Sequence, residues 1–270
     1  MYVAFEGIDG SGKSAQADLL EAWWTRAGRV VRRSREPDES NPVGKLLRSL
    51  LVTGRHPRAH AALFLADRMV SDDQRCVFLE RGDSIVQDRS FVSTLVYQET
   101  YYPRGHLEAM HVGLRAVPDL VIVLDVPIEV AAERIRQRAG PSEVYETGSW
   151  LEVTRERYRR CAPSVMCGNV GVPVVILDGQ GTPEEVQSRV VWEIQHGAGS
   201  RELNSRGLIH RYAEKRVNPD FGRIVVQDGS EDARDERIAR QRLAEIEAAP
   251  ESVIRGAELE ELLAKYEEES

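Results

Sequence analysis

The chain has 270 residues, 41% of them hydrophobic, with 36 basic and 44 acidic side chains and a formal net charge of −8. This length and apolar content predict a globular protein with one substantial core and room for a small appendage. The acidic balance excludes the broad basic surface of a duplex-DNA binder. No apolar run approaches the roughly 18 residues of a membrane span. We therefore expect no DNA, RNA or membrane partner.

A short apolar run, Tyr2 to Phe5, leads directly into Gly-x-x-x-x-Gly-Lys-Ser at residues 7–14, which is the complete Walker A pattern. Its glycines let the backbone turn tightly and approach an anion, and a helix starting near Lys13 adds free amide groups and the positive end of its dipole. We expect Lys13 to reach the β and γ phosphates of ATP and the Ser14 hydroxyl to ligate Mg²⁺. The predicted ATP-binding residues are Gly7, Ile8, Asp9, Gly10, Ser11, Gly12, Lys13 and Ser14.

The cellular location is predicted from two further features. The Walker loop begins at the seventh residue, which leaves no room before it for a signal peptide. The cysteines Cys76, Cys161 and Cys167 are odd in number and lack zinc-ligand spacing, so no disulfide framework or zinc site is indicated. We therefore expect a cytoplasmic protein.

Apolar strands and amphipathic helices alternate after the loop. The run at 120–125 is apolar throughout and suits a strand covered on both faces. Further strands are predicted at 30–35, 83–88 and 174–178, and helices at 15–27, 44–51, 57–80, 92–100, 107–116, 127–139, 150–161 and 182–195. This order predicts an α/β fold with a five-stranded parallel sheet wrapped by helices, over a domain of residues 1–199.

Residues 200–270 are predicted to form a separate, charged and mostly helical extension. Residues 201–270 hold 12 basic and 17 acidic side chains, and apolar residues recur at helical spacing from Ala239 to Ile246 and from Leu259 to Tyr266. Such stripes need a covering surface. The surface that covers them could belong to the chain's own domain, to the other subunit of a homodimer or to an unknown partner.

Several short motifs stand in an order that resembles the thymidylate kinase family of P-loop nucleoside monophosphate kinases. The resemblance covers residues 1 to about 196 and implies transfer of the γ-phosphoryl group of ATP to dTMP, giving dTDP, with Mg²⁺. The motifs are the loop at 5–14, Arg35-Glu36-Pro37, Phe64-Leu65-Ala66-Asp67-Arg68, Asp88-Arg89 followed by Ser93 and Tyr97-Gln98, and Pro118-Asp119-Leu120.

The resemblance also implies individual roles. Asp9 would help Ser14 to organise the metal, and Arg89 would grip the phosphate of the acceptor nucleotide. Phe64 would stack on the thymine and Arg68, one helical turn later, would hydrogen-bond its edge. The other residues implied on the acceptor side are Tyr97 against the deoxyribose, Ser93, Thr94 and Gln98 in the same pocket, and Arg35 and Arg48 as weaker phosphate ligands.

Residues 136–149 occupy the place of the family's mobile lid. The arginine expected in the lid signature is missing from Glu143-Val144-Tyr145-Glu146, so the predicted catalytic cation is Arg136 or Arg138. Ser90 and Asp38 also depart from the family pattern, which leaves a kinase for another or modified pyrimidine monophosphate as an alternative. A nucleotide-binding regulatory protein acting through its tail is a second alternative. The joint presence of Lys13, Ser14, Asp9 and Arg89 argues against that second one.

Overall fold

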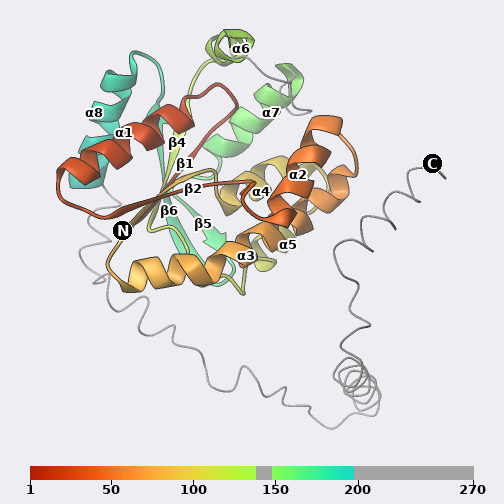
Figure 1. The fold of residues 1–270 in the computed structure, drawn as a ribbon. Helices are drawn as coiled ribbons and strands as arrows, with labels where there is room; N and C mark the ends of the chain where they lie inside the picture. The colour runs from red at the N-terminus through yellow and green to blue at the C-terminus, as the bar shows by residue number, and fades with distance from the viewer. Residues whose placement is uncertain (138–147, 198–270) are drawn as a thin grey trace, which may run out of the picture. The chain divides into compact units, whose positions relative to one another are not determined.

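The computed structural model describes residues 1–137 and 148–197. Their centre is a six-stranded sheet with the strand order β2-β3-β1-β4-β6-β5 (Figure 1). The strands are β1 (Tyr2–Glu6), β2 (Val31–Arg35), β3 (Ser84–Asp88), β4 (Leu120–Asp125), β5 (Ser164–Cys167) and β6 (Val170–Asp178). The predicted extension at 200–270 and most of the predicted lid lie outside the described residues.

The helices follow the strands in the alternation that the sequence predicts. They are α1 (Lys13–Arg26), α2 (Pro42–Thr53), α3 (His60–Glu80), α4 (Phe91–Tyr97), α5 (Arg104–Ala109), α6 (Ile128–Gln137), α7 (Gly148–Arg159) and α8 (Pro183–His196), with 3₁₀ turns η1 (Pro57–Ala59) and η2 (Gln98–Thr100). Within the described ranges, no helix is both long and apolar enough to cross a lipid bilayer.

Two apolar layers enclose the sheet because successive strand residues point to opposite faces. Val3 and Phe5 of β1 pack with Leu20 and Trp24 of α1 in one buried cluster, which also contains residues of α8. Ala4, between them in sequence, belongs to the cluster on the other face. Accordingly, α1 and α8 lie together on one side of the sheet, and α2 to α5 and α7 lie on the other (Figure 1).

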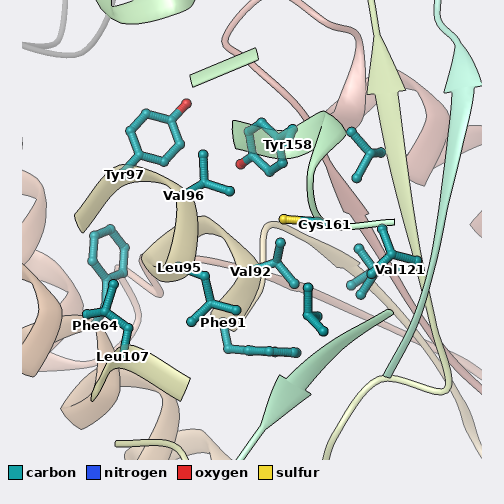
Figure 2. Close-up of a cluster of buried hydrophobic side chains, with 14 of the residues drawn as sticks. Phe64, Phe91, Val92, Leu95, Val96, Tyr97, Leu107, Val121, Tyr158 and Cys161 are labelled. Carbon is teal, nitrogen blue, oxygen red and sulfur yellow. The ribbon is translucent and has the colours of Figure 1, made fainter. Parts of the chain in front are cut away.

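Helix α4 is the centre of the second layer. All seven of its residues, Phe91–Tyr97, are buried. Figure 2 shows Val92 and Leu95 of this helix between Phe64 of α3 and Val121 of β4. A helix whose residues are all buried is held firmly, because moving it would disturb a close-packed core. The residues at its two ends are therefore fixed in position.

The structure corrects two expectations about secondary structure. The five parallel strands are present, but β5 adds a sixth, antiparallel strand at the edge next to β6. This strand has only four residues, with buried and exposed side chains alternating, so its apolar signal is weak. The helix predicted at 107–116 instead runs from Arg104 to Ala109, and turns follow it in which the amides of His111 and Val112 donate to the carbonyl oxygens of Glu108 and Ala109 (both 3.2 Å).

Candidate active site

The loop between β1 and α1 has the backbone that its glycines predict. Gly7, Gly10 and Gly12 have φ values of 136°, 78° and 97°, which disfavour residues with a Cβ atom. A Cβ on Gly7 would lie 2.6 Å from the carbonyl oxygen of Leu124, and one on Gly10 would lie 2.4 Å from that of Ala131. Glycine is therefore required both for the turn and for the close packing of the loop against β4 and α6.

The start of α1 is open to an anion. Its N-cap residue, Gly12, supplies no side-chain acceptor for the amides of the first turn. Lys13 is 6% exposed, and its Nζ donates to the carbonyl oxygens of Gly7 (3.1 Å) and Ile8 (2.9 Å). Burial, together with the nearby Arg89 guanidinium, lowers the pKa of Lys13 to about 8. The ammonium group thus lies within the loop, where phosphate oxygens can replace the carbonyl contacts.

Oxygen ligands suited to Mg²⁺ lie beside this lysine. The Ser14 hydroxyl donates to the Asp88 carboxylate at 2.5 Å, and Asp9 lies on the same cavity wall. A hydroxyl with two carboxylates suits a small hard cation that takes its other ligands from phosphates and water. Asp88 is a further candidate metal ligand that the sequence analysis did not name. Its position at the end of β3, next to the Walker loop, is the signal that could have identified it.

Arg89 adopts a left-handed backbone conformation, with φ of 67°, which is uncommon for a residue with a side chain. Its side chain forms an ion pair with Asp9 and donates to Ser93 Oγ (3.3 Å) and to the Tyr97 hydroxyl (3.4 Å). The guanidinium also lies over the Tyr97 ring, 5.4 Å from its centroid. The arginine is therefore held beside the Walker loop by contacts with its neighbours on both sides.

A cavity of about 510 Å³ joins the Walker loop to the predicted acceptor residues. Twelve of the residues predicted from the sequence line it: Asp9, Gly10, Gly12, Lys13, Ser14, Arg35, Arg48, Phe64, Arg89, Ser93, Tyr97 and Gln98. The predicted residues Gly7, Ile8, Ser11, Arg68, Thr94 and Arg136 do not line this cavity. Arg138 lies outside the described residues.

Arg134 is a cavity-lining cation that the prediction passed over in favour of Arg136 and Arg138. Its guanidinium donates to the carbonyl oxygens of Gly10 (3.2 Å) and Ser11 (3.4 Å). The Arg136 side chain is 74% exposed and pairs with Glu133 on the same helix. Residues two apart on a helix point in nearly opposite directions. Helical spacing therefore indicates that Arg134 and Arg136 cannot both face the loop.

The two departures from the family pattern serve as local caps away from the cavity. The Ser90 hydroxyl is the N-cap acceptor for the amide of Val92 (3.3 Å) and donates to the buried Glu6 (2.8 Å). Asp38 accepts from the amide of Ser40 at 3.0 Å. Neither Ser90 nor Asp38 lines the cavity. Their side chains therefore help to order the start of α4 and the approach to α2 without shaping the cavity wall.

Glu6, which is completely buried, is a polar centre that sequence reasoning missed. Its carboxylate accepts from the amide and hydroxyl of Ser90, from the amide and hydroxyl of Ser93, and from the hydroxyl of Tyr158, all between 2.7 and 3.1 Å. A buried carboxylate needs such donors to offset its lost hydration. Glu6 thereby ties the end of β1 to α7 and to the start of α4, which begins two residues after Arg89.

The Walker loop and three arginines, Arg35, Arg48 and Arg89, line one cavity, and the sheet beside it has five parallel strands and one antiparallel edge strand. This arrangement defines a P-loop kinase. A thymidylate kinase family model matches residues 5–190, more than half of the chain, and the chain belongs to the thymidylate kinase family.

Named relatives agree with this family. The chain is 38% identical to a probable thymidylate kinase of Thermococcus kodakarensis over 176 residues, covering 60% of this chain and 84% of the relative. It is 32% identical to one of Thermococcus onnurineus over 210 residues, covering 73% and 98%. The solved thymidylate kinase of Candida albicans shares the fold, with a TM-score of 0.60 and 22% identity over 73% of this chain and 92% of that one.

Proposed function

We propose that this protein phosphorylates dTMP to dTDP, with ATP as the phosphoryl donor and Mg²⁺ as the metal. The observation that carries the proposal is the single cavity lined by both Lys13 and Arg89. Arg89 pairs with Asp9 and Lys13 donates to the carbonyl oxygens of Gly7 and Ile8, so both cations lie against the same loop and can act on neighbouring phosphates. Phosphoryl transfer requires two anionic groups to be held together, and paired cations reduce their repulsion.

The donor side would be formed by the Walker loop. Backbone amides at the start of α1 and the Lys13 ammonium would hold the β and γ phosphates. Ser14, with Asp88 and Asp9, would hold Mg²⁺, which when bound neutralises phosphate charge. Arg134 lies beside this loop and lines the cavity, and we propose it as a donor-side cation in place of Arg136. Arg138 stays a prediction from the sequence.

The acceptor side would hold the nucleoside by shape and its phosphate by charge. Phe64 and Tyr97 are 8% and 6% exposed, and both line the cavity, so their rings can pack on the base and the deoxyribose. Arg89, with Arg35 and Arg48 on the same wall, supplies positive charge for the acceptor phosphate. These positions support dTMP as the acceptor nucleotide.

The proposal includes a cytoplasmic homodimer. Val70 and Val77 of α3 are 55% and 42% exposed, and positions seven residues apart fall on one face of a helix. An exposed apolar stripe of this kind supports a contact between subunits. Sedimentation should give twice the monomer mass. A contact of residues 200–270 with the second subunit or another partner remains a prediction.

The function is tested by ADP release from ATP and Mg²⁺ with a panel of nucleoside monophosphates. We expect turnover with dTMP that depends on Lys13. The same mixture without any monophosphate measures background ATP hydrolysis and serves as the control. Absence of ADP release above that background with every monophosphate would refute the proposed kinase activity.

A further inference from the structure

A second cavity, also of about 510 Å³, lies beside β2, the edge strand of the sheet, and we call it the β2 cavity. Residues of α1, β2 and α3 line it. It adjoins the active-site cavity at Ser14, Arg35 and Asp88, which line both cavities. The basic residues on its wall are Arg32, Arg33, Arg35 and Arg75.

Two of these arginines already have ion-pair partners. Arg32 pairs with Asp83 at 2.8 Å, and Arg33 pairs with Asp18 at 2.9 Å. Arg35 is exposed and forms no ion pair with a described residue. The positive charge that this wall can offer to a ligand therefore comes from Arg35 and from Arg75.

The carboxylates on the same wall are also occupied. Asp18 is the partner of Arg33. Asp38 accepts from the Ser40 hydroxyl at 2.6 Å, and Asp88 accepts from the Ser14 hydroxyl at 2.5 Å. None of these contacts involves Arg75.

Arg75 is a buried cation with few hydrogen-bond acceptors. Its side chain is 6% exposed. Among the described residues, the only hydrogen-bond acceptor for its five N–H groups is the Ser34 hydroxyl, 3.2 Å from Nη2. Nε is buried and has no acceptor in the described part of the chain. The Glu36 carboxylate lies 3.8 Å from Nη2, which is too far for a hydrogen bond.

Arg68, seven residues earlier on α3, is paired much more completely. It contacts the same Glu36 carboxylate at 2.7 and 2.8 Å, and it also donates to the Ser90 carbonyl oxygen and the Thr94 hydroxyl. Glu36 is thus the close partner of Arg68. A buried guanidinium without acceptors costs free energy, so its position on a cavity wall indicates that Arg75 receives an acceptor from the cavity.

We propose that the β2 cavity binds a phosphate-bearing small molecule, with Arg75 as its main ligand. The side of a guanidinium that carries Nε and Nη2 matches two oxygens of a phosphate group, which is the geometry in which arginine binds oxyanions. The Ser34 hydroxyl accepts from Arg75 and can donate its own proton to the same anion. Arg35 adds a second positive charge. Arg75 does not line the active-site cavity, so this ligand is bound in addition to the two nucleotides of the reaction.

The first test is titration calorimetry with pyrophosphate and the full chain, without added metal. The wild type should bind pyrophosphate at the Walker loop and in the β2 cavity. Arg75→Met should bind one pyrophosphate fewer per chain, or bind it at least about tenfold more weakly. Its melting temperature should stay within about 3 °C of the wild type, because Arg75 makes a single hydrogen bond to a described residue. Equal binding by the two proteins would overturn the proposal.

Arg157→Met is the matched control for the lost charge. The Arg157 side chain is 13% exposed and pairs with Glu99 at 3.3 Å, and it lines neither cavity. Its replacement changes the net charge by the same amount and should leave pyrophosphate binding unchanged. A loss as large as that in Arg75→Met would overturn the proposal, because binding would then follow the overall charge of the protein.

A further variant locates the bound anion and does not depend on how well Arg75→Met folds. Lys13→Ala combined with Arg89→Ala removes two cations from the active-site cavity and none from the β2 cavity. This double variant should still bind one pyrophosphate per chain with the affinity of the second wild-type site, and adding Arg75→Met should abolish that binding. Complete loss of binding in the double variant would overturn the proposal, since every pyrophosphate would then lie in the active-site cavity.

Discussion

The two walls of the cavity are built differently. The donor wall comes mainly from one continuous segment, Asp9 to Ala15, with Arg134 of α6 beside it, and its shape depends on backbone angles and on the space that glycines leave. The acceptor wall combines the end of β2, helices α2 and α3, and the segment from Asp88 to Gln98. Buried side-chain contacts such as Glu36–Arg68 and Glu6–Ser93 hold these segments together. Substitutions in the donor wall should therefore affect the reaction, and substitutions behind the acceptor wall should affect folding.

The largest expected effect is on stability, from Arg68→Met. This change leaves Glu36 charged and buried without its main partner, and should lower the free energy of unfolding by about 3–5 kcal/mol. Chemical denaturation measures it. The control is Arg160→Met, because the side chains of the Arg160–Glu99 pair are 56% and 20% exposed and such a pair contributes about 0–1 kcal/mol. Equal losses in the two variants would contradict the described acceptor wall.

Lys13→Ala should give the complementary result on the donor wall. Loss of one charge in a water-poor site should lower kcat by about 10² to 10³-fold. The fold should persist and the free energy of unfolding should not decrease, because the burial that lowers the pKa of Lys13 makes its charge unfavourable for folding at neutral pH. Steady-state kinetics and thermal melting check the two parts. Unchanged turnover would refute the Walker assignment.

The base pocket should show a moderate preference for dTMP over dUMP. Phe64 on the cavity wall can contact the thymine methyl group, and one methyl group in an apolar pocket gives about 10 to 200-fold in kcat/KM. A substrate panel measures the ratio. Turnover of another monophosphate without any turnover of dTMP would show that the acceptor nucleotide is a different one.

ATP affinity should depend on pH through Lys13. Its pKa in the free protein is about 8, and bound phosphate favours the charged form and raises that pKa in the complex. Affinity should thus be level between about pH 7 and 8 and fall by up to tenfold per pH unit above 8. The effect of pH on folding has the opposite sign. In the unfolded chain this lysine keeps its proton up to a pH of about 10.5, so its contribution to the free energy of unfolding increases between pH 8 and pH 10.5. Titration calorimetry on wild type and on Lys13→Met, which should lack this pH dependence, provides the check.

The smallest expected effect on the reaction comes from truncation after residue 199. The cavity-lining residues lie between Asp9 and Arg134, and α8 ends at His196. The catalytic constant should remain within about twofold of the full chain, while the melting temperature or the sedimenting mass decreases if the extension covers a subunit surface. A folded truncate that binds ATP but phosphorylates no monophosphate would place part of the active site in residues 200–270.

The same contrast explains how much could be predicted from the sequence. Gly7, Gly10, Gly12 and Lys13 act through local backbone geometry, so their spacing alone predicts the cradle. The buried contacts of Arg68 could not be predicted, because Glu36, Thr94 and His111 come from three distant segments and meet only in the folded chain.

Two other features were missed for related reasons. Strand β5 was missed because its short alternating pattern is stabilised by pairing with β6, a contact that becomes visible only in the sheet. Arg134 was passed over for Arg136, although helical periodicity alone limits how many of the α6 arginines can face the loop. Strand β5 was therefore missed because it depends on a long-range contact, whereas Arg134 was missed because helical periodicity was not applied to the arginines of α6.

The central claim is that donor and acceptor phosphates meet between Lys13 and Arg89 in one cavity. The most direct measurement is titration calorimetry with a bisubstrate analogue, adenosine and thymidine joined by a chain of phosphates. We predict one molecule bound per chain, at least about 100-fold more tightly than ATP or dTMP alone, because the second half binds at high effective concentration. Lys13→Ala and Arg89→Ala should each weaken this binding. An analogue that binds no more tightly than ATP would contradict the account, since the two nucleotide sites would then not share one cavity.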